Sequence, residues 1–147
     1  MIPLNPWEHQ NAIKALYSKC VADVCTKHGI TRMELDILLF LVNNPIFDTA
    51  TDMVETRFLS KSQVSASIKL LEMRGYLRKE YTRDNRKTAH LKVCDKALPV
   101  IEDGRAAQEK FASILMRGLT QEEMEHIKIC FDRMWENVNG YLKEDEG

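Results

Sequence analysis

Apolar side chains recur every three or four residues near the N-terminus, which predicts a helix from about residue 7 to residue 27. Gly29 ends this helix. A second helix is predicted to begin at Thr31, because Thr31 and Glu34 have the spacing of a capping box. The stripe that the first helix would bury consists of Ile13, Leu16, Tyr17, Cys20, Val21 and Val24.

Two further helices are predicted before residue 76, and the second of them has two different faces. The first begins near Thr49, and the second begins at Ser60, which forms another capping-box pattern with Gln63. Gly75 suits the left-handed position just past the end of that helix. Its predicted buried face holds Val64, Ile68 and Leu71, and its opposite face holds Ser62, Ser65, Ala66 and Lys69. The opposite face therefore has no bulky apolar side chain.

The periodicity then changes from helical to alternating. The stretches GYLRKEY and TAHLKVC each alternate apolar and polar residues, which predicts two short strands. Between them lies YTRDNRKTAH, from Tyr81 to His90, which contains no residue that must be buried. This stretch is predicted to be the loop of a β-hairpin.

Two long helices are predicted after the hairpin. Asp95 is expected to cap the first, with Pro99 near its first turn, and Thr120 with Glu123 opens the second. The last helix has the apolar spacing of a coiled-coil seam, through Met124, Ile127, Phe131, Met134, Val138 and Tyr141. Such a seam can be an intramolecular core stripe, but the first and fifth helices also need partners, which favours dimerisation.

These elements predict a mainly α fold with a small β-hairpin wing. A length of 147 residues favours one domain, spanning residues 1–147. Within it, residues 31–94 form a winged helix-turn-helix, and residues 1–30 and 95–147 form flanking helices. The helix-turn-helix and the wing are thus predicted to be consecutive parts of one unit.

Charge is unevenly distributed along the chain. The formal net charge is −1, but residues 57–92 contain ten cations and three acids, a local balance of +7. The remainder has eleven cations and nineteen acids, a balance of −8. This segregation favours a basic surface with an anionic partner, although charge alone leaves an inert dipolar surface open.

A cationic hairpin beside a helix with small polar side chains is suited to double-stranded DNA. Serine and alanine let the helix backbone approach the major groove, where Gln63 and Lys69 offer hydrogen bonds. The wing would reach phosphates or a narrow minor groove. For Arg78 and Lys79, DNA contact and simple protection of a strand edge are equally open. A merely solvated helix face and a plain Asp-Asn turn are the alternatives for the helix and the wing tip.

The segment LSKSQVSASIKLLEMRGYLRKEYTRDNRKTAHLKV resembles the recognition helix and wing of MarR-type transcriptional regulators. The matching parts are the serine-rich helix, the Leu-Glu-x-x-Gly close, the cationic strand and the Asp84-Asn85-Arg86 wing tip, and the flanking helices occur in the family's order. One departure follows the second strand: residues 93–97 read VCDKA where the family usually has Leu-Thr and then glycine three residues after the threonine. The departure affects the start of the next helix.

The resemblance implies a homodimer whose interface is built by the flanking helices. It also implies a sequence-specific transcriptional regulator, a repressor more often than an activator, that binds a palindromic operator and responds to a small-molecule effector or an oxidant. The effector would lie between the dimer helices and the winged domain, lined by the first, second and fifth helices. On the wing, Asp84 would orient Arg86 by an ion pair, and Arg86 would contact DNA. The predicted DNA-binding residues are Ser60, Lys61, Ser62, Gln63, Ser65, Ala66, Lys69, Arg83, Asp84, Arg86 and Lys87.

Other chemistries find little support in the sequence. The four cysteines form no C-x-x-C and the four histidines are scattered, so neither a metal nor a cofactor is predicted. Cys20 and Cys25 are candidate redox sensors, although Cys20 lies in an apolar stripe. No catalytic motif indicates an enzyme. With neither a signal peptide nor an apolar run of membrane-spanning length, no membrane association and a cytoplasmic location are expected. The alternatives are a winged-helix protein-interaction module that does not bind DNA and a cysteine-based redox regulator.

Overall fold

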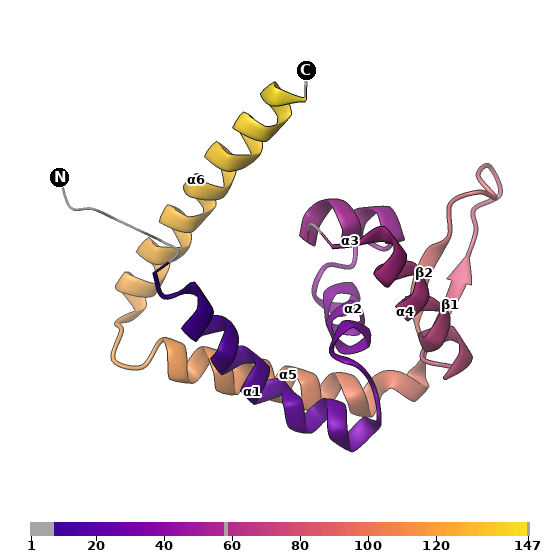
Figure 1. Ribbon diagram of the computed structural model, residues 1–147, viewed down its shortest axis with the longest axis horizontal. Helices are drawn as coiled ribbons and strands as arrows, with labels where there is room; N and C mark the ends of the chain where they lie inside the picture. Colours follow the sequence, from indigo (N-terminus) through magenta and orange to yellow (C-terminus); the bar gives the residue numbers. More distant parts are fainter. Residues whose placement is uncertain (1–7, 58, 147) are drawn as a thin grey trace. The chain divides into compact units, whose positions relative to one another are not determined.

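The computed structural model describes residues 8–57 and 59–146. Their contacts divide the chain into two compact units, Met1–Phe111 and Ala112–Gly147, each described here by itself. Figure 1 shows the order of the elements along the chain. The elements are α1 (Gln10–His28), α2 (Arg32–Asn43), α3 (Ala50–Arg57), α4 (Lys61–Met73), β1 (Leu77–Glu80), β2 (His90–Val93), η1 (Asp95–Ala97), α5 (Leu98–Leu115) and α6 (Gln121–Asp145).

The first two helices begin and end close to their predicted boundaries. Gly29 follows α1 in the left-handed conformation, with φ of 62°, and its N–H donates to carbonyls of the last turn. Thr31 and Glu34 form the predicted capping box at the start of α2. The predicted start of the first helix at residue 7 lies outside the described residues. Of its apolar stripe, Val21 and Val24 are buried, whereas Ile13 is 41% exposed, because the core packs against α1 from Tyr17 onward.

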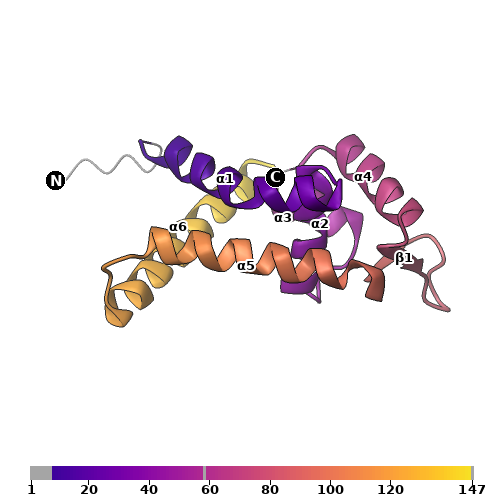
Figure 2. The same ribbon diagram turned by 90° about the horizontal axis from the view of Figure 1, so that it is seen from below.

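The core of the first unit is centred on α2. Leu35, Ile37, Leu38 and Leu39 of this helix are almost fully buried. Gly104 lets α5 approach α2 closely, because a Cβ atom at this position would lie 3.0 Å from Cδ2 of Leu39. Figures 1 and 2 show α1 and α5 running side by side, and the rings of Tyr17 and Phe111 meet edge to face with centroids 5.2 Å apart. The helices of this unit thus form a rigid support for the segment that follows α2.

The segment from α3 to β2 has the predicted helix-turn-helix and hairpin. Helix α3 is capped by Thr49, whose hydroxyl accepts from the Asp52 N–H at 3.1 Å. Val64, Ile68 and Leu71 of α4 are buried as predicted. Gly75 adopts φ of 77° just past α4, as predicted, and the following Tyr76 N–H donates to the Leu71 carbonyl. This turn directs the chain from α4 straight into β1.

The hairpin is a two-stranded antiparallel sheet. Leu77 lies opposite Val93, and Glu80 lies opposite His90. Leu77 and Leu91 are buried and attach the base of the hairpin to the core. The Leu91 N–H also donates to the Asp48 carbonyl at 2.8 Å, which joins the hairpin to the loop before α3. Helix α4 contacts β1, and Figure 1 shows the hairpin loop extending beyond the strands.

Two predicted caps differ from the structure. Asp95 was expected to cap the helix after the hairpin, but it begins the 3-10 turn η1 and makes no capping hydrogen bond. The tight turn buries Ala97 completely, so α5 begins only at Leu98, with Pro99 in its first turn, where proline is tolerated. At α4 the capping box is half formed: the Ser60 hydroxyl accepts from the Gln63 N–H, but the Ser60 N–H does not donate to the Gln63 side chain.

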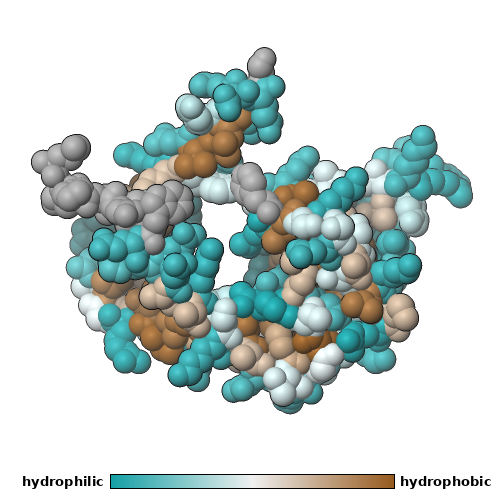
Figure 3. Space-filling model, viewed as in Figure 1, coloured by the Kyte–Doolittle hydropathy of each residue, from teal (hydrophilic) through white to brown (hydrophobic). Residues whose placement is uncertain are grey.

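The second unit contains the end of α5 and the whole of α6. Thr120 and Glu123 form the predicted capping box at the start of α6. None of the 25 residues of α6 is buried. Residues of the predicted seam remain open to solvent, with Phe131 60%, Val138 50% and Tyr141 70% exposed, and Figure 3 shows a hydrophobic band on this helix. No helix within residues 8–57 and 59–146 has the length and apolarity needed to cross a membrane.

Candidate nucleic-acid interface

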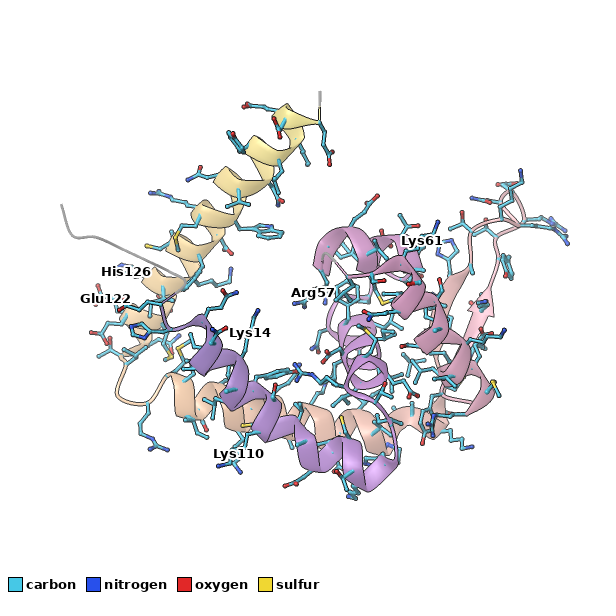
Figure 4. All side chains as sticks on the ribbon, in the orientation of Figure 1. Lys14, Arg57, Lys61, Lys110, Glu122 and His126 are labelled. Carbon is cyan, nitrogen blue, oxygen red and sulfur yellow. The ribbon has the colours of Figure 1, made fainter. Side chains whose placement is uncertain are left out.

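Helix α4 presents small and polar side chains to solvent up to Lys69, and its last turn also exposes Leu70 and Met73. Its predicted outer residues Ser62, Ser65, Ala66 and Lys69 are all exposed, while the opposite face is packed into the core. At its start the hydroxyls of Ser60 and Ser62 lie 3.0 Å apart and share a hydrogen bond. Lys61, at the first residue of the helix, is labelled in Figure 4. The helix therefore has a low, polar outer surface that can approach another backbone closely.

Nine of the ten cations of the basic segment fall into two classes, and the tenth, Arg57, lies over the ring of Phe40. Those near the base of the hairpin and the end of α4 are paired with acids: Arg74 with Glu34, Arg78 with Glu80, Lys79 with Glu72 and Lys92 with Asp48. Those on the outer face of α4 and at the wing tip have no acidic partner within residues 8–57 and 59–146: Lys61, Lys69, Arg83, Arg86 and Lys87. Positive charge without a local counter-charge is thus concentrated on the outer face of α4 and at the tip of the hairpin, and Figure 3 shows the protruding hairpin loop as hydrophilic.

The sequence left open whether Arg78 and Lys79 contact DNA or only protect a strand edge. Their ion pairs answer this question in part. The guanidinium of Arg78 donates twice to Glu80, at 2.9 and 3.1 Å, and lies within reach of Cys94. These interactions raise the pKa of Arg78 above its already high value, with the Glu80 hydrogen bonds as the largest cause. Lys79 is held less firmly, at 3.2 Å from Glu72. Arg78 therefore has a local role at the strand edge.

The wing tip is organised by Asn85. Its side-chain oxygen accepts from the N–H groups of Lys87 and Thr88, at 3.0 and 3.2 Å, and its amide donates to the Thr88 hydroxyl at 2.9 Å. The Asn85 N–H donates to the Thr82 hydroxyl. This network fixes the turn without using the charged residues on either side of Asn85.

The predicted ion pair between Asp84 and Arg86 is absent from the structure. No salt bridge joins them among the described residues, and both side chains are exposed. The physical reason is that the Asn85 hydrogen bonds already hold the turn, and an exposed ion pair would contribute little in water. Arg86 is consequently free to take a partner outside the chain.

Helix and wing share one hollow. A cavity of about 300 Å³ is lined by Ser65 of α4, by Lys79 of β1 and by Lys87 and Thr88 of the hairpin loop, together with Thr49 and Thr51 at the start of α3. The outer face of α4 and the cationic loop therefore belong to one continuous surface. The sequence placed Ser65 and Lys87 in this surface and missed Thr49 and Thr51, because nothing local in the sequence brings α3 next to the hairpin.

The base of the wing is anchored through Asp48. Its carboxylate lies 2.8 Å from Nδ1 of His90 and 3.3 Å from Nζ of Lys92. Burial of the carboxyl would raise its pKa, but the hydrogen bonds from His90 and Lys92 outweigh this effect, so the pKa of Asp48 lies below its usual value. Sequence reasoning missed this cluster, because its members are separated by more than forty residues.

A larger cavity, of about 630 Å³, lies within the first unit between α1, α2, α3 and α5. Lys14 and Arg57, both labelled in Figure 4, enter it from α1 and from the end of α3. Aromatic rings of Tyr17, Phe40 and Phe111 line it as well. The cavity is thus lined by α1, α2 and α5, the helices that the family resemblance implied for an effector site, and also by α3.

One carboxylate also faces this larger cavity. Asp36 is paired with Arg32 at 2.9 Å, and Arg32 lies over the ring of Tyr17, 4.6 Å from its centroid. Burial raises the pKa of Asp36 despite the hydrogen bond from Arg32, and the charge of its carboxylate is compensated by Arg32. Lys14 has no acidic partner among the described residues, and Arg57 stacks on Phe40 at 5.3 Å. The cavity therefore has an excess of positive charge beside aromatic walls.

The candidate redox residues Cys20 and Cys25 are both partly buried in the structure. All four are free thiols; Cys20, Cys25 and Cys94 are partly buried, and Cys130 is exposed. Desolvation is the main reason that the pKa of Cys25 is raised, which lowers its thiolate fraction. Among the described residues no three His, Cys, Asp or Glu side chains are grouped as metal ligands would be.

The chain was compared with known proteins. The sequence profile of the MarR family matches residues 28–87, which include α2, α3, α4, β1 and most of the hairpin loop. No curated protein matches the chain in sequence.

Solved structures share the fold over nearly the whole chain. A MarR family transcriptional regulator from Listeria monocytogenes, complexed with a 26mer DNA, superposes with a TM-score of 0.80 at 16% identity, covering 99% of this chain and 97% of that one. A MarR protein from Peptoclostridium difficile gives a TM-score of 0.76 at 19% identity, covering 97% and 95%. A MepR mutant from S. aureus bound to an oligodeoxyribonucleotide gives 0.58 at 14% identity, covering 92% and 99%. The MarR family profile thus covers the helix-turn-helix segment of the chain, and the solved structures share its winged helix fold over nearly the whole length.

Proposed function

We propose that the protein is a dimeric, sequence-specific DNA-binding transcriptional regulator that acts as a repressor. The observation that carries the proposal is the set of cations without acidic partners on α4 and the wing tip, on a surface that continues through one shared hollow. The DNA that accompanies the Listeria and S. aureus relatives supports the same role for this fold.

In this role α4 enters the major groove and the wing follows the adjacent minor groove. Ser62, Ser65 and Ala66 allow the close approach, and Gln63 and Lys69 supply hydrogen-bond donors for base edges or phosphates. Arg83 and Arg86 extend from the hairpin toward phosphates or the minor groove. The caps at Ser60 and Asn85 hold the two elements in shape before DNA arrives, which limits the ordering cost of binding.

Dimerisation is proposed through α6 and a second copy of the chain. A 25-residue helix without a buried side chain does not hold its apolar seam in water without a partner. The three-and-four spacing of the seam fits helix-to-helix packing. Two copies related by a two-fold axis would present two α4 helices, which predicts a palindromic operator.

Effector control is proposed through the larger cavity. Its unpaired cation Lys14, the adjacent Arg57 and its aromatic walls favour a small organic anion with a flat apolar body. Arg57 ends α3, only three residues before the cap of α4, so a ligand that binds Arg57 can change the position of α4. Such a ligand would alter operator affinity only as far as it prefers one arrangement of α4 over another.

Selection of duplexes from random DNA with the full chain tests the proposal. Enriched sequences should contain two inverted copies of one half-site, and affinity for them should fall steeply with salt concentration. A transcription assay with that operator inside a promoter should show lower output when the protein is added. Failure to enrich any sequence, or binding that does not respond to salt, would contradict DNA binding, and higher output would contradict repression.

A further inference from the structure

The hollow between α3, α4 and the hairpin is lined by cations and hydroxyl groups but by no acid. Two cations, Lys79 and Lys87, and four hydroxyls, of Thr49, Thr51, Ser65 and Thr88, line its polar parts, and no acid lines it. Its apolar part includes Ile68 and Leu91, which the core holds in place. Its volume of about 300 Å³ has ample room for one tetrahedral anion.

The polar groups of the hollow retain donors that the protein does not use. The hydroxyl of Thr49 accepts from the Asp52 N–H, and that of Thr88 accepts from the Asn85 amide, so each hydroxyl proton can still be donated. Lys79 forms an ion pair with Glu72 at 3.2 Å, and its ammonium group has three hydrogens to donate. Lys87 has no acidic partner among the described residues. Several convergent donors and a local positive charge select an anion rather than a cation or a neutral ligand.

The nearby acids do not oppose an anion in this place. Asp48 is engaged by His90 and Lys92, and Glu72 is engaged by Lys79. Neither carboxylate lines the hollow.

The position of the hollow indicates the source of the anion. In a duplex, a single sugar–phosphate strand separates a major groove from the neighbouring minor groove. A protein that puts α4 in one groove and its wing in the next must straddle that strand. The hollow lies between these two elements, with Ser65 on the α4 side and Lys87 on the wing side. The strand between the grooves would therefore face it.

We infer that this hollow is a seat for one phosphodiester of the DNA backbone in each half-site, an inference that rests on the function proposed above. Lys79 and Lys87 neutralise the phosphate, and the hydroxyls of Thr51, Ser65 and Thr88 hydrogen-bond to its oxygens. The contact is independent of base sequence, and it fixes how deeply α4 sits in the major groove. Thr51 and Lys79 are thus positioning residues for the α4 side chains that face the bases.

A methylphosphonate walk along the selected operator tests the seat. In each duplex one phosphate per half-site is replaced by its neutral methyl analogue, and affinity is measured for the wild type, Lys79→Met and Thr51→Val. One position should weaken the wild type about tenfold and each variant by less than about threefold, because the variants have already lost part of the contact. Lys79→Met should also lower the salt slope by about one and keep the ranking of operator sequences.

Controls separate the seat from general effects. Lys128→Met changes an exposed lysine of α6 in the same way and should keep both the walk profile and the salt slope of the wild type. Valine has nearly the volume of threonine, so Thr51→Val still tests the phosphate seat if Lys79→Met does not fold. An equal response of wild type and variants at every backbone position would overturn the seat while leaving the proposed function intact. A wild type that binds no duplex would overturn both.

Inorganic phosphate distinguishes the backbone from a free anion. At constant ionic strength, phosphate and chloride should have the same effect on the amide resonances of Thr51 and Thr88 in the DNA-free protein, since a single weakly held phosphate lacks the flanking contacts of a duplex. Saturable shifts with phosphate alone, combined with a flat methylphosphonate profile, would make the hollow a site for a free anion and overturn the inference.

Discussion

Asp48 and His90 form a polar contact of 2.8 Å that joins the loop before α3 to the first residue of β2. The neighbouring Leu91 N–H donates to the carbonyl of the same aspartate, so both the side chain and the backbone of Asp48 hold the hairpin. Only 18% of the Asp48 side chain is exposed, which protects the contact from water. The orientation of the wing relative to α3 therefore depends on one residue outside the hairpin.

Replacing Asp48 with Asn should destabilise the fold by about 1–2 kcal/mol, because the charged acceptor for His90 and Lys92 is lost. Urea unfolding at neutral pH measures the change in the free energy of unfolding. Asp84→Asn is the matched control, since Asp84 is exposed and forms no ion pair with any other described residue, and it should leave stability unchanged.

Stability should also depend on pH through Asp48. The pKa of this carboxyl is lower in the folded chain than in the unfolded chain, so its contribution is fully present above the unfolded value, near 4. The contribution decreases as the pH falls below that value and is lost below the folded pKa. The free energy of unfolding is measured between pH 6 and pH 2, a range that spans the titration of an ordinary Asp. Over this range it should fall less in Asp48→Asn than in the wild type. Parallel curves for the two proteins would contradict the assignment.

Arg86→Ala should weaken operator binding by about 1–3 kcal/mol, because the side chain has no partner within the described chain and is free for DNA. Arg78→Ala is the comparison, since Arg78 is held by Glu80 and should matter less. Band-shift titrations at several salt concentrations measure both effects. Equal losses for the two variants would mean that the pairing of Arg78 does not keep it from DNA.

Local signals in the sequence predicted much of the fold. The capping boxes at Thr31 and Thr120 each involve residues three positions apart, so the motif and the contact coincide. Gly75 was similarly readable, because few other residues tolerate its positive φ. The change from helical to alternating periodicity located both strands of the hairpin.

Contacts between distant residues could not be predicted in this way. Glu34 was recognised as a capping residue, but its second oxygen accepts from Arg74 at 2.9 Å, forty positions later, and the side chain is completely buried. The cavities depend on the same kind of contact, since α3 reaches each of them only in the folded chain. At Asp95 a local signal was misleading. The residue is suited to capping a helix, but it begins the 3-10 turn η1, because burial of Ala97 favoured a tighter turn.

Phe131→Glu should separate the proposed dimer. Phe131 lies in the middle of the α6 seam and is 60% exposed in the single chain, so a partner helix is needed to cover it. A buried aromatic anchor contributes about 2 kcal/mol or more, which corresponds to a dissociation constant raised about thirtyfold. Sedimentation velocity over a range of concentrations measures the change. Lys128→Ala, a change at an exposed lysine of the same helix, should leave the dimer intact.

Arg57→Met should reduce the response of the protein to a small aromatic carboxylate. Benzoate serves as the probe, because its carboxylate can pair with Arg57 and Lys14 while its ring meets Tyr17 or Phe111. In the wild type, benzoate should raise the unfolding temperature in a saturable way and change operator affinity, since binding to the folded state stabilises it.

The pattern of lost responses distinguishes binding of benzoate from the transmission of that binding to α4. If Arg57→Met abolishes both effects, the guanidinium is needed for binding. If the variant keeps the thermal shift but loses the change in operator affinity, Arg57 instead transmits binding to α4, whose cap lies three residues further along the chain. Lys110→Met, a lysine of α5 that does not line the cavity, is the matched control and should keep both responses. A wild type that binds benzoate without any change in operator affinity would contradict effector control through this cavity.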